Sequence, residues 1–279
     1  MNNFTLRAIT GALYVAALVG SLLGGPIAFT CFFTLVAALC VWEFCTVLNA
    51  QLNATINRFI ATVGAASFML AMSQAVVIGP SYQLFLPFVA TLLYILISEL
   101  YRKDANPLKN WGFAFAAQLY ITLPLSMIFL LAYRYDAMSN TLPYSYVLPL
   151  SIFLFLWTSD TGAYLCGSAL SKYFPAKLFE RISPNKSWVG SIGGGVLCLA
   201  VAAALWHFFP ERLPLWQWMG LGLVVCIFGT WGDLVESLFK RQLGIKDSGN
   251  ILPGHGGMLD RFDSALLAIP AGVIFLLML

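Results

Sequence analysis

Apolar residues dominate nine stretches of this chain, and each approaches the length of a helix that crosses a lipid bilayer. Such a helix needs about 20 mainly apolar residues. The stretches lie at roughly residues 8–24, 26–48, 58–78, 82–101, 112–132, 145–166, 189–209, 217–235 and 264–279. Because polar, glycine- or proline-containing segments separate them, the pattern predicts an all-α, polytopic integral membrane protein with about nine transmembrane helices.

The first stretch, 8–24, is short enough to be compared with a secretory signal peptide. Arg7 precedes it, but no small-residue cleavage site follows, and the next apolar stretch begins at residue 26. We therefore expect a retained transmembrane helix and not a cleaved signal.

Lysine and arginine fall almost entirely on one side of the predicted membrane. Of the 15 basic residues, only Arg134 and Arg212 lie on the other side. Those on the first side are Arg7, Arg58, Arg102, Lys103, Lys109, Lys172, Lys177, Arg181, Lys186, Lys240, Arg241, Lys246 and Arg261. Because basic loops stay in the cytoplasm, we expect a cytoplasmic N-terminus and a C-terminus on the opposite side. We expect Arg7, Arg58 and the three basic residues at 102–109 to contact anionic lipid head groups.

Composition agrees with a membrane protein, since 60% of the residues are hydrophobic and only 10% are charged. The loops are too short for a separate soluble domain, so we expect one integral membrane domain over 1–279. Its N-terminal helices fill 1–135, and its motif-bearing part lies at 145–264. The six cysteines form no CxxC pair and are expected to be small buried hydrophobes instead of metal ligands.

Two predicted cytoplasmic loops, 167–188 and 236–263, are long and rich in glycine, proline, serine and charge. Three carboxylates, Glu43, Asp160 and Asp233, lie near the cytoplasmic ends of predicted helices. An ionisable group in a transmembrane helix is a functional candidate. The alternative is a side chain that extends to water.

Two motifs offer a structural alternative to a functional role. In GDLVESLFKR, continued helix would place Asp233, Glu236 and Lys240 on one face. They would then form either a helix-end salt bridge or a carboxylate and a cation in one cytoplasmic cavity. In WTSDTGAYLCG, Asp160 stands among small residues that also favour close helix packing.

The segment RISPNKSWVGSIGGG joins a loop to a predicted helix. Ser187 is positioned to cap that helix, and glycines follow it. Unpaired N–H groups at a helix N-terminus attract phosphate, and Lys186 is adjacent. Taken alone this signal is weak, because glycine in membrane helices more often serves packing.

The stretch Ser237 to Ser264 holds seven of the 27 formally charged residues. Its lysines and arginines can neutralise phosphates. Its carboxylates, Asp247, Asp260 and Asp263, are hard oxygen ligands suited to Mg²⁺. The segment PGHGG lets backbone approach a ligand closely, and His255 within it is not expected to be a core residue. The combination predicts a site for phosphate and metal.

These residues resemble a known family. The stretch SLFKRQLGIKDSGNILPGHGGMLDRFD is similar over its whole length to the signature of the phosphatidate cytidylyltransferases, also called CDP-diacylglycerol synthases. The similarity extends to SDTGAY at 159–164, SPNKSW at 183–188, GDLVES at 232–237 and, more loosely, WEF at 42–44.

The resemblance implies that CTP and phosphatidate give CDP-diacylglycerol and pyrophosphate in phospholipid biosynthesis, and that Mg²⁺ is required. It also implies a two-cation centre held by Asp233 and Asp260, with the identity of the second cation open. We assign the candidate residues to three roles: catalytic, Lys240, Arg241, Lys246 and Asp247; substrate-binding, Ser183, Asn185, Lys186, Ser187, Ser237, His255, Gly256, Gly257 and Arg261; metal-binding, Asp233, Asp260, Asp263 and Asp160.

The expected partners are CTP, phosphatidate and membrane lipids, without nucleic acid, and a homodimer is also considered. The expected location is the bacterial inner membrane with the active site facing the cytoplasm. The main alternative is a secondary transporter or channel, which also uses carboxylates within the membrane. An alcohol phosphotransferase would need the motif DGxxAR, which the chain lacks.

Overall fold

The computed structural model describes residues 3–103, 106–133, 142–254 and 256–279, so Arg134 and His255 lie outside the described residues. The chain forms two compact units, Met1–Tyr146 with Leu243–Phe262, and Val147–Gln242 with Asp263–Leu279. Each unit is described by itself.

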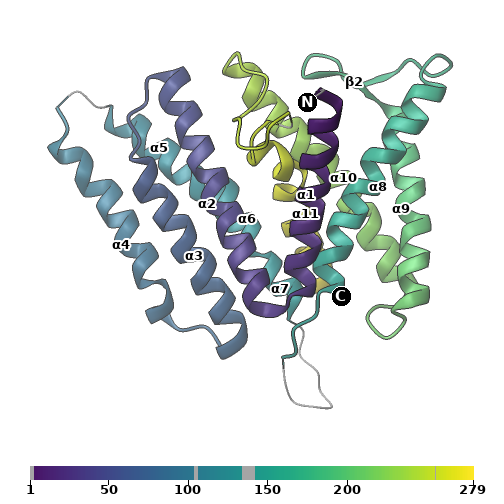
Figure 1. Ribbon diagram of the computed structural model, residues 1–279, viewed down its shortest axis with the longest axis horizontal. Coiled ribbons are helices and arrows are strands. Elements are labelled where there is room, and N and C mark those ends of the chain that lie inside the picture. The colour runs from purple at the N-terminus through teal and green to yellow at the C-terminus, as the bar shows by residue number, and fades with distance from the viewer. Residues whose placement is uncertain (1–2, 104–105, 134–141, 255) are drawn as a thin grey trace. The chain divides into compact units, whose positions relative to one another are not determined.

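The first unit is a set of helices followed, later in the chain, by the loop 243–258 (Figure 1). Its elements are α1 (Asn3–Leu23), α2 (Gly25–Leu52), α3 (Arg58–Ile78), α4 (Tyr82–Ser98), η1 (Glu99–Tyr101), α5 (Pro107–Ala117), η2 (Gln118–Thr122), α6 (Leu123–Ser126) and α7 (Ile128–Ala132). Asn57 and Asn106 cap α3 and α5 by accepting hydrogen bonds from backbone N–H groups at 3.2 Å.

The second unit contains α8 (Val147–Leu170), β1 (Lys177–Phe179), β2 (Ser183–Ser187), α9 (Trp188–Phe208) and α10 (Leu215–Gln242). Most of α11 (Leu259–Leu277) also belongs to it, whereas the first residues of α11 belong to the first unit. The strands pair in antiparallel register, Lys177 with Ser187 and Phe179 with Ser183, with an irregularity between them.

The predicted helical pattern is confirmed in outline. Each predicted stretch coincides with a helix, and 112–132 coincides with the run α5–η2–α6–α7. Several boundaries differ: α1, α5 and α11 already begin at Asn3, Pro107 and Leu259, and α2, α8 and α10 continue to Leu52, Leu170 and Gln242. A β-hairpin also occupies part of the loop predicted at 167–188. The η2 segment is a π-helix, and Pro124 lies in the first turn of the following α6, where its lack of an N–H group removes one helical hydrogen bond.

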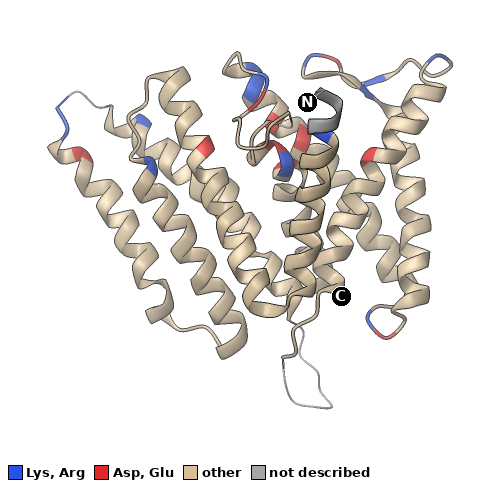
Figure 2. Ribbon diagram, viewed as in Figure 1, with Lys and Arg blue, Asp and Glu red and all other residues tan. Residues whose placement is uncertain are grey.

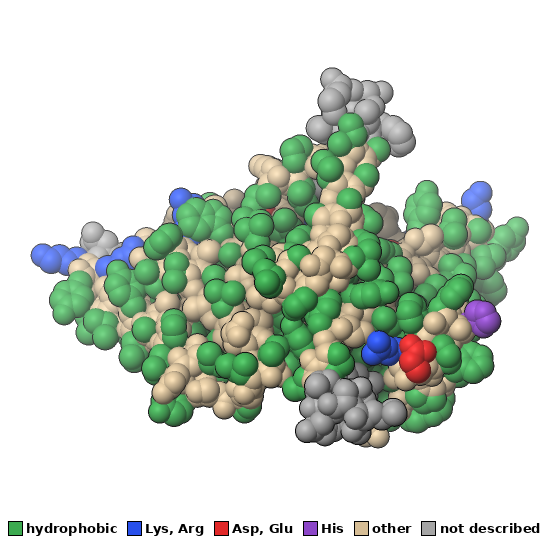
Figure 3. All heavy atoms as spheres, turned by 60° about the horizontal axis from the view of Figure 1, so that its bottom comes forward, with side chains coloured by type: hydrophobic (Ala, Val, Ile, Leu, Met, Phe, Trp, Pro, Cys, Tyr) green, Lys and Arg blue, Asp and Glu red, His purple; other side chains and the backbone are tan. Residues whose placement is uncertain are grey.

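Six helical segments of the described residues are long and apolar enough to cross a membrane. They are Gly25–Leu52, Arg58–Ile78, Tyr82–Tyr101, Pro107–Ala132, Trp188–Phe208 and Leu215–Gln242, and α1 adds the shorter apolar segment Arg7–Leu23. The first five residues of α11 include three charged ones, and α8 contains the polar run Ser159 to Thr161. Figure 3 shows hydrophobic side chains spread over one face with few charged ones among them, as expected for helices that contact lipid.

Charge is unevenly distributed within the first unit. Figure 2 shows the charged residues of the first unit gathered at one end of its helices. There, Arg102 donates a hydrogen bond to the Thr55 carbonyl and forms a 3.1 Å ion pair with the buried Glu99. Glu99 also accepts a 2.8 Å hydrogen bond from Asn110. This network joins the ends of α4 and α5 to the turn before α3.

Glycine sets the helix spacing in the second unit. A Cβ added to Gly162 on α8 would lie 2.8 Å from Gly194 Cα, and one on Gly194 would lie 2.7 Å from the Ser159 carbonyl oxygen. Because real Cβ atoms do not approach so closely, α8 and α9 can keep this spacing only with glycine at these positions. The predicted packing role of the small residues around Asp160 is therefore confirmed.

Candidate active site

Asp260 fixes the loop 243–258 of the first unit. Its Oδ2 accepts three hydrogen bonds, from Ser248 N at 2.8 Å, Ser248 Oγ at 2.9 Å and Gly257 N at 2.8 Å. Only 8% of Asp260 is exposed. Hydrogen bonds to a buried carboxylate are strong, so this side chain ties two distant parts of the loop to the start of α11.

Glu43 of α2 contacts the same loop and the start of α11 through its carboxylate. Its Oε2 accepts a 2.9 Å hydrogen bond from Leu259 N, across 216 residues of sequence. A Cβ on Gly249 or Gly257 would lie within 2.5 Å of a Glu43 carboxylate oxygen, so glycine is required for this contact. Because only 4% of Glu43 is exposed, the alternative of a side chain extending to water does not hold.

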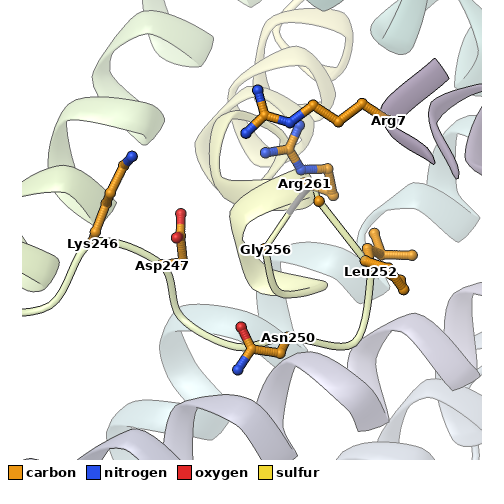
Figure 4. A pocket seen from close by; sticks show the side chains of 9 residues that line it. Arg7, Lys246, Asp247, Asn250, Leu252, Gly256 and Arg261 are labelled. Atoms are coloured by element: carbon orange, nitrogen blue, oxygen red, sulfur yellow. The ribbon is translucent and has the colours of Figure 1, made fainter. Parts of the chain in front are cut away.

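A polar cavity of about 440 Å³ lies in the first unit beside this loop (Figure 4). It is lined by Arg7, Lys246, Asp247, Asn250, Leu252, Pro253, Gly254, Gly256 and Arg261. Its volume is within the range of small-molecule sites. The structure thus brings four predicted site residues together, Lys246, Asp247, Gly256 and Arg261, and adds Arg7. Gly257 lies next to them and binds Asp260 through its N–H group.

The hairpin of the second unit brings Lys186 to α10. Lys186 Nζ forms a 2.6 Å ion pair with Asp233 Oδ2 and donates a 3.3 Å hydrogen bond to the Thr230 carbonyl. The next residue, Ser187, caps α9 by accepting a hydrogen bond from Gly190 N at 3.2 Å, as predicted. Ser183 and Asn185 lie on the same strand, β2, and Asn185 is exposed.

Asp233 also has partners on its own helix and a carboxylate neighbour. Ser237 Oγ donates a 3.1 Å hydrogen bond to Asp233 Oδ1. A Cβ on the preceding Gly232 would lie 2.6 Å from the Asp263 carbonyl oxygen, so glycine lets α11 pack directly on α10. Asp263 precedes the apolar run 264–279. Burial first, and the nearby Asp233 carboxylate second, raise the pKa of Asp263 to about 7. The charge of Asp160 on α8 also raises the pKa of Asp263.

Lys240 forms a 2.6 Å ion pair with Glu236, one helical turn earlier, and Glu236 is fully buried. The predicted continuation of this helix is confirmed, and so is the helix-end salt bridge. Lys240 also lowers the pKa of Asp263 through its charge, so it lies close to the carboxylates of α10 and α11. Arg241 follows on α10 and is exposed.

The candidate residues thus form two sets with different chemistry. The first unit presents three cations and one carboxylate around a cavity, which suits a polyanion. The second unit presents Asp160, Asp233 and Asp263 with Lys186 and Lys240. Carboxylate oxygens suit a hard divalent cation, although no three His, Cys, Asp or Glu side chains within the described ranges are arranged to hold a metal ion.

Long apolar helices together with these charged clusters describe a membrane protein whose polar groups suit a phosphorylated substrate and a divalent cation. The cytidylyltransferase family model matches residues 5–279, and this chain belongs to that family.

Individual relatives support this membership. Phosphatidate cytidylyltransferase of Staphylococcus aureus strain COL is 33% identical over 267 residues, which cover 95% of this chain and 96% of the relative. The phosphatidate cytidylyltransferases of Staphylococcus saprophyticus and Staphylococcus haemolyticus are 44% and 46% identical over 138 residues, half of each chain.

Sequence reasoning missed one residue of these clusters, Arg7, and found a second, Glu43, without its contacts. It assigned Arg7 to lipid head groups, because nothing local connects residue 7 with a loop near residue 254. It named Glu43 as a functional candidate without a partner. The adjacent small residues at 248–249 and 256–257 were a usable signal, since glycine lets the backbone come close to another group.

Proposed function

We propose that this chain transfers CMP from CTP to phosphatidate, forming CDP-diacylglycerol and pyrophosphate for phospholipid synthesis. The similarity to the Staphylococcus aureus phosphatidate cytidylyltransferase carries the proposal, because it spans 95% of this chain and 96% of the relative. A secondary transporter or channel is not favoured, since the family and the relatives are cytidylyltransferases.

In this reaction a phosphate oxygen of phosphatidate attacks the α-phosphorus of CTP. The bond from that phosphorus to the bridging oxygen breaks, and pyrophosphate leaves with the electron pair. A phosphate monoester has its second pKa near about 6, so phosphatidate is largely ionised at neutral pH and needs no strong base. The main barrier is the approach of two anions, so catalysis consists of charge neutralisation and alignment.

The cavity cations are suited to the phosphates of CTP. Lys246 and Arg261 would neutralise the triphosphate and assist the departing pyrophosphate, while the backbone at Gly256 allows close approach. Asp247 lies at the same cavity and would orient a neighbouring cation or the substrate. His255, predicted to bind substrate, lies outside the described residues.

The second unit supplies groups for the reacting phosphates. Ser183, Asn185, Lys186 and Ser187 lie on or at the end of β2, and Lys186 reaches Asp233. Ser237 hydrogen-bonds the same carboxylate. Lys240, anchored by Glu236, and Arg241 would add positive charge at the end of α10.

The carboxylates fit Mg²⁺ by donor type, since they offer hard oxygen atoms. We propose Asp233 and Asp263 of the second unit as ligands of one cation, with Asp160 nearby. In the first unit we propose Asp260 as a cation ligand in addition to its hydrogen bonds within the loop. When bound, the metal would neutralise phosphate charge and polarise the α-phosphorus. A second cation is part of the same proposal.

The remaining features of the proposal concern the setting. The whole chain, 1–279, forms one catalytic domain with nine transmembrane helices, a cytoplasmic N-terminus and a C-terminus on the opposite side. It lies in a bacterial inner membrane with its active site facing the cytoplasm, where CTP is available. Phosphatidate reaches it from the surrounding lipid, and a homodimer is the proposed assembly. The segregation of basic residues supports this orientation.

The test is a direct assay of the full-length protein in detergent with labelled CTP, phosphatidate and Mg²⁺. We expect label in a lipid-linked CMP product and equimolar pyrophosphate. Chelating the metal should stop the reaction, and adding Mg²⁺ should restore it. Absence of a metal-dependent lipid product from folded protein would contradict the proposal.

A further inference from the structure

Arg7 lies near the start of α1, far in sequence from the loop 243–258. Yet it lines the same cavity as Lys246 and Arg261. Figure 4 shows the guanidinium groups of Arg7 and Arg261 reaching the same side of the cavity, although they come from different helices. From this position we infer that Arg7 is a third phosphate-binding residue of the substrate site. The inference rests on the proposed function, which it extends to the N-terminal helix.

The loop is shaped to receive Arg7. A Cβ on Gly254 would lie 3.0 Å from Arg7 Cγ, tighter than most real contacts, so glycine lets the backbone pack against the arginine stem. Gly254 also has a φ of +77°, which glycine adopts without strain. One turn further along α1, Thr10 Oγ1 donates a 3.0 Å hydrogen bond to the Pro253 carbonyl. These contacts position Arg7 against the cavity instead of leaving it as a mobile surface side chain.

The cavity around Arg7 carries a net positive charge, which favours binding of an anion. Arg7, Lys246 and Arg261 line the cavity with a single carboxylate, Asp247. Across the described residues, the salt bridges within 4.0 Å involve Arg102, Lys186, Arg212 and Lys240, and none of the three cavity cations. Three cations that converge with only one carboxylate beside them repel one another, and a polyanion between them removes that repulsion. Guanidinium groups bind phosphate through two parallel N–H···O hydrogen bonds.

The bound phosphate belongs either to CTP or to the head group of phosphatidate. The triphosphate is the better match, because three cations suit a ligand with several negative charges. Most of the other lining residues, Asn250 and the glycines among them, offer polar or backbone groups and no acyl-chain groove. The experiment separates these two sources.

The experiment compares Arg7→Gln with Arg7→Lys in the full-length protein. Two quantities are measured: the KM for each substrate, and the Kd for labelled CTP by equilibrium dialysis without phosphatidate. We expect Arg7→Gln to weaken CTP binding by about 10–100-fold, the value of one charged hydrogen-bonding group. Arg7→Lys should recover part of this loss, because it keeps the charge but not the planar fork. The KM for phosphatidate should stay within about twofold.

The matched control is Arg58→Gln in the same unit. Arg58 lies over the Trp42 ring at 4.4 Å and donates a 3.3 Å hydrogen bond to Thr46. It is not one of the residues that line the cavity with Arg7. It should leave both KM values unchanged. An Arg7→Gln effect on the KM for phosphatidate alone would assign the phosphate to the lipid. Unchanged binding of both substrates by folded Arg7→Gln would overturn the inference. A change in KM that appears only when the anionic lipid content of the assay is varied would overturn it too.

The dialysis also separates this inference from the proposed function. If the wild-type protein binds CTP in an Arg7-dependent way but forms no lipid-linked CMP, the reaction is wrong and the Arg7 site stands. If the lipid product forms equally well with Arg7→Gln and the Kd is unchanged, the reaction stands and the Arg7 site is wrong. Equal melting temperatures of variant and wild-type protein are the folding check.

Discussion

In the first unit the carboxylates of Glu43 and Asp260 accept hydrogen bonds from backbone N–H groups, whereas in the second unit Asp233 and Glu236 are paired with lysines. Glu43 and Asp260 are 4% and 8% exposed. The side chain of Asp233 is 33% exposed, and that of its partner Lys186 is 24% exposed. The partners of Asp233 are therefore side chains at a partly exposed site, while those of Asp260 are two backbone N–H groups and a serine hydroxyl at a buried site.

This difference separates two uses of acidic residues. A carboxylate that collects backbone N–H groups defines a loop conformation, and its loss should mainly lower stability. A partly exposed carboxylate with a lysine partner contributes little to stability. It can instead exchange that lysine for a substrate-bound cation, and its loss should mainly lower turnover. Three substitutions test the division.

Asp233→Asn should have the largest effect. We expect kcat to fall by about 100-fold or more, because even the outer partners of metal ligands change activity by about 10–100-fold. The melting temperature should hardly change, since the amide can still accept a hydrogen bond from Ser237. Initial rates of lipid-linked CMP formation over a Mg²⁺ titration measure the effect. Glu211→Gln, an exposed carboxylate with a 3.7 Å contact to Arg212, is the control and should behave as wild type. A normal kcat for Asp233→Asn would remove Asp233 from the site.

Asp260→Ala should have the largest effect on stability. It removes the acceptor of three hydrogen bonds and leaves the Ser248 and Gly257 N–H groups without this partner. The expected cost is about 3 kcal/mol or more, seen as a lower melting temperature in detergent together with weaker CTP binding. Asp263→Asn, three residues further along α11, should cost little stability, because a site that raises the pKa of Asp263 to about 7 accepts a neutral side chain. Equal melting temperatures for both variants would break the comparison.

The helical pattern was predictable because the thickness of a bilayer fixes the length of an apolar helix. The cap at Ser187 and the helical face of Glu236 and Lys240 were predictable for a similar reason, since both depend on residues three or four positions apart. Apart from Arg7, the candidate residues of each set were found from charge, glycine and short motifs. All these signals are local or compositional.

The contacts that organise the sites were not predictable in this way. Glu43 meets Leu259 across 216 residues, and Arg7 meets Gly254 across most of the chain. The hairpin was missed because its strands are short and polar and show no apolar alternation. Such pairings depend on which helix ends lie together, and periodicity along one segment carries no information about that.

The smallest expected effect concerns helix spacing in the second unit, where neighbouring glycines of α9 differ sharply. A Cβ at position 194 would lie 2.7 Å from the Ser159 carbonyl oxygen, whereas one at 195 would lie 3.8 Å from Leu223. Gly194→Ala should therefore force α8 and α9 apart and cost about 1–3 kcal/mol, whereas Gly195→Ala makes an ordinary contact and should keep the wild-type melting temperature. Since Ser159 precedes Asp160, Gly194→Ala should also lower kcat more than it changes the Kd for CTP. If both variants melt alike, the close contact of α8 with α9 does not control the position of Asp160.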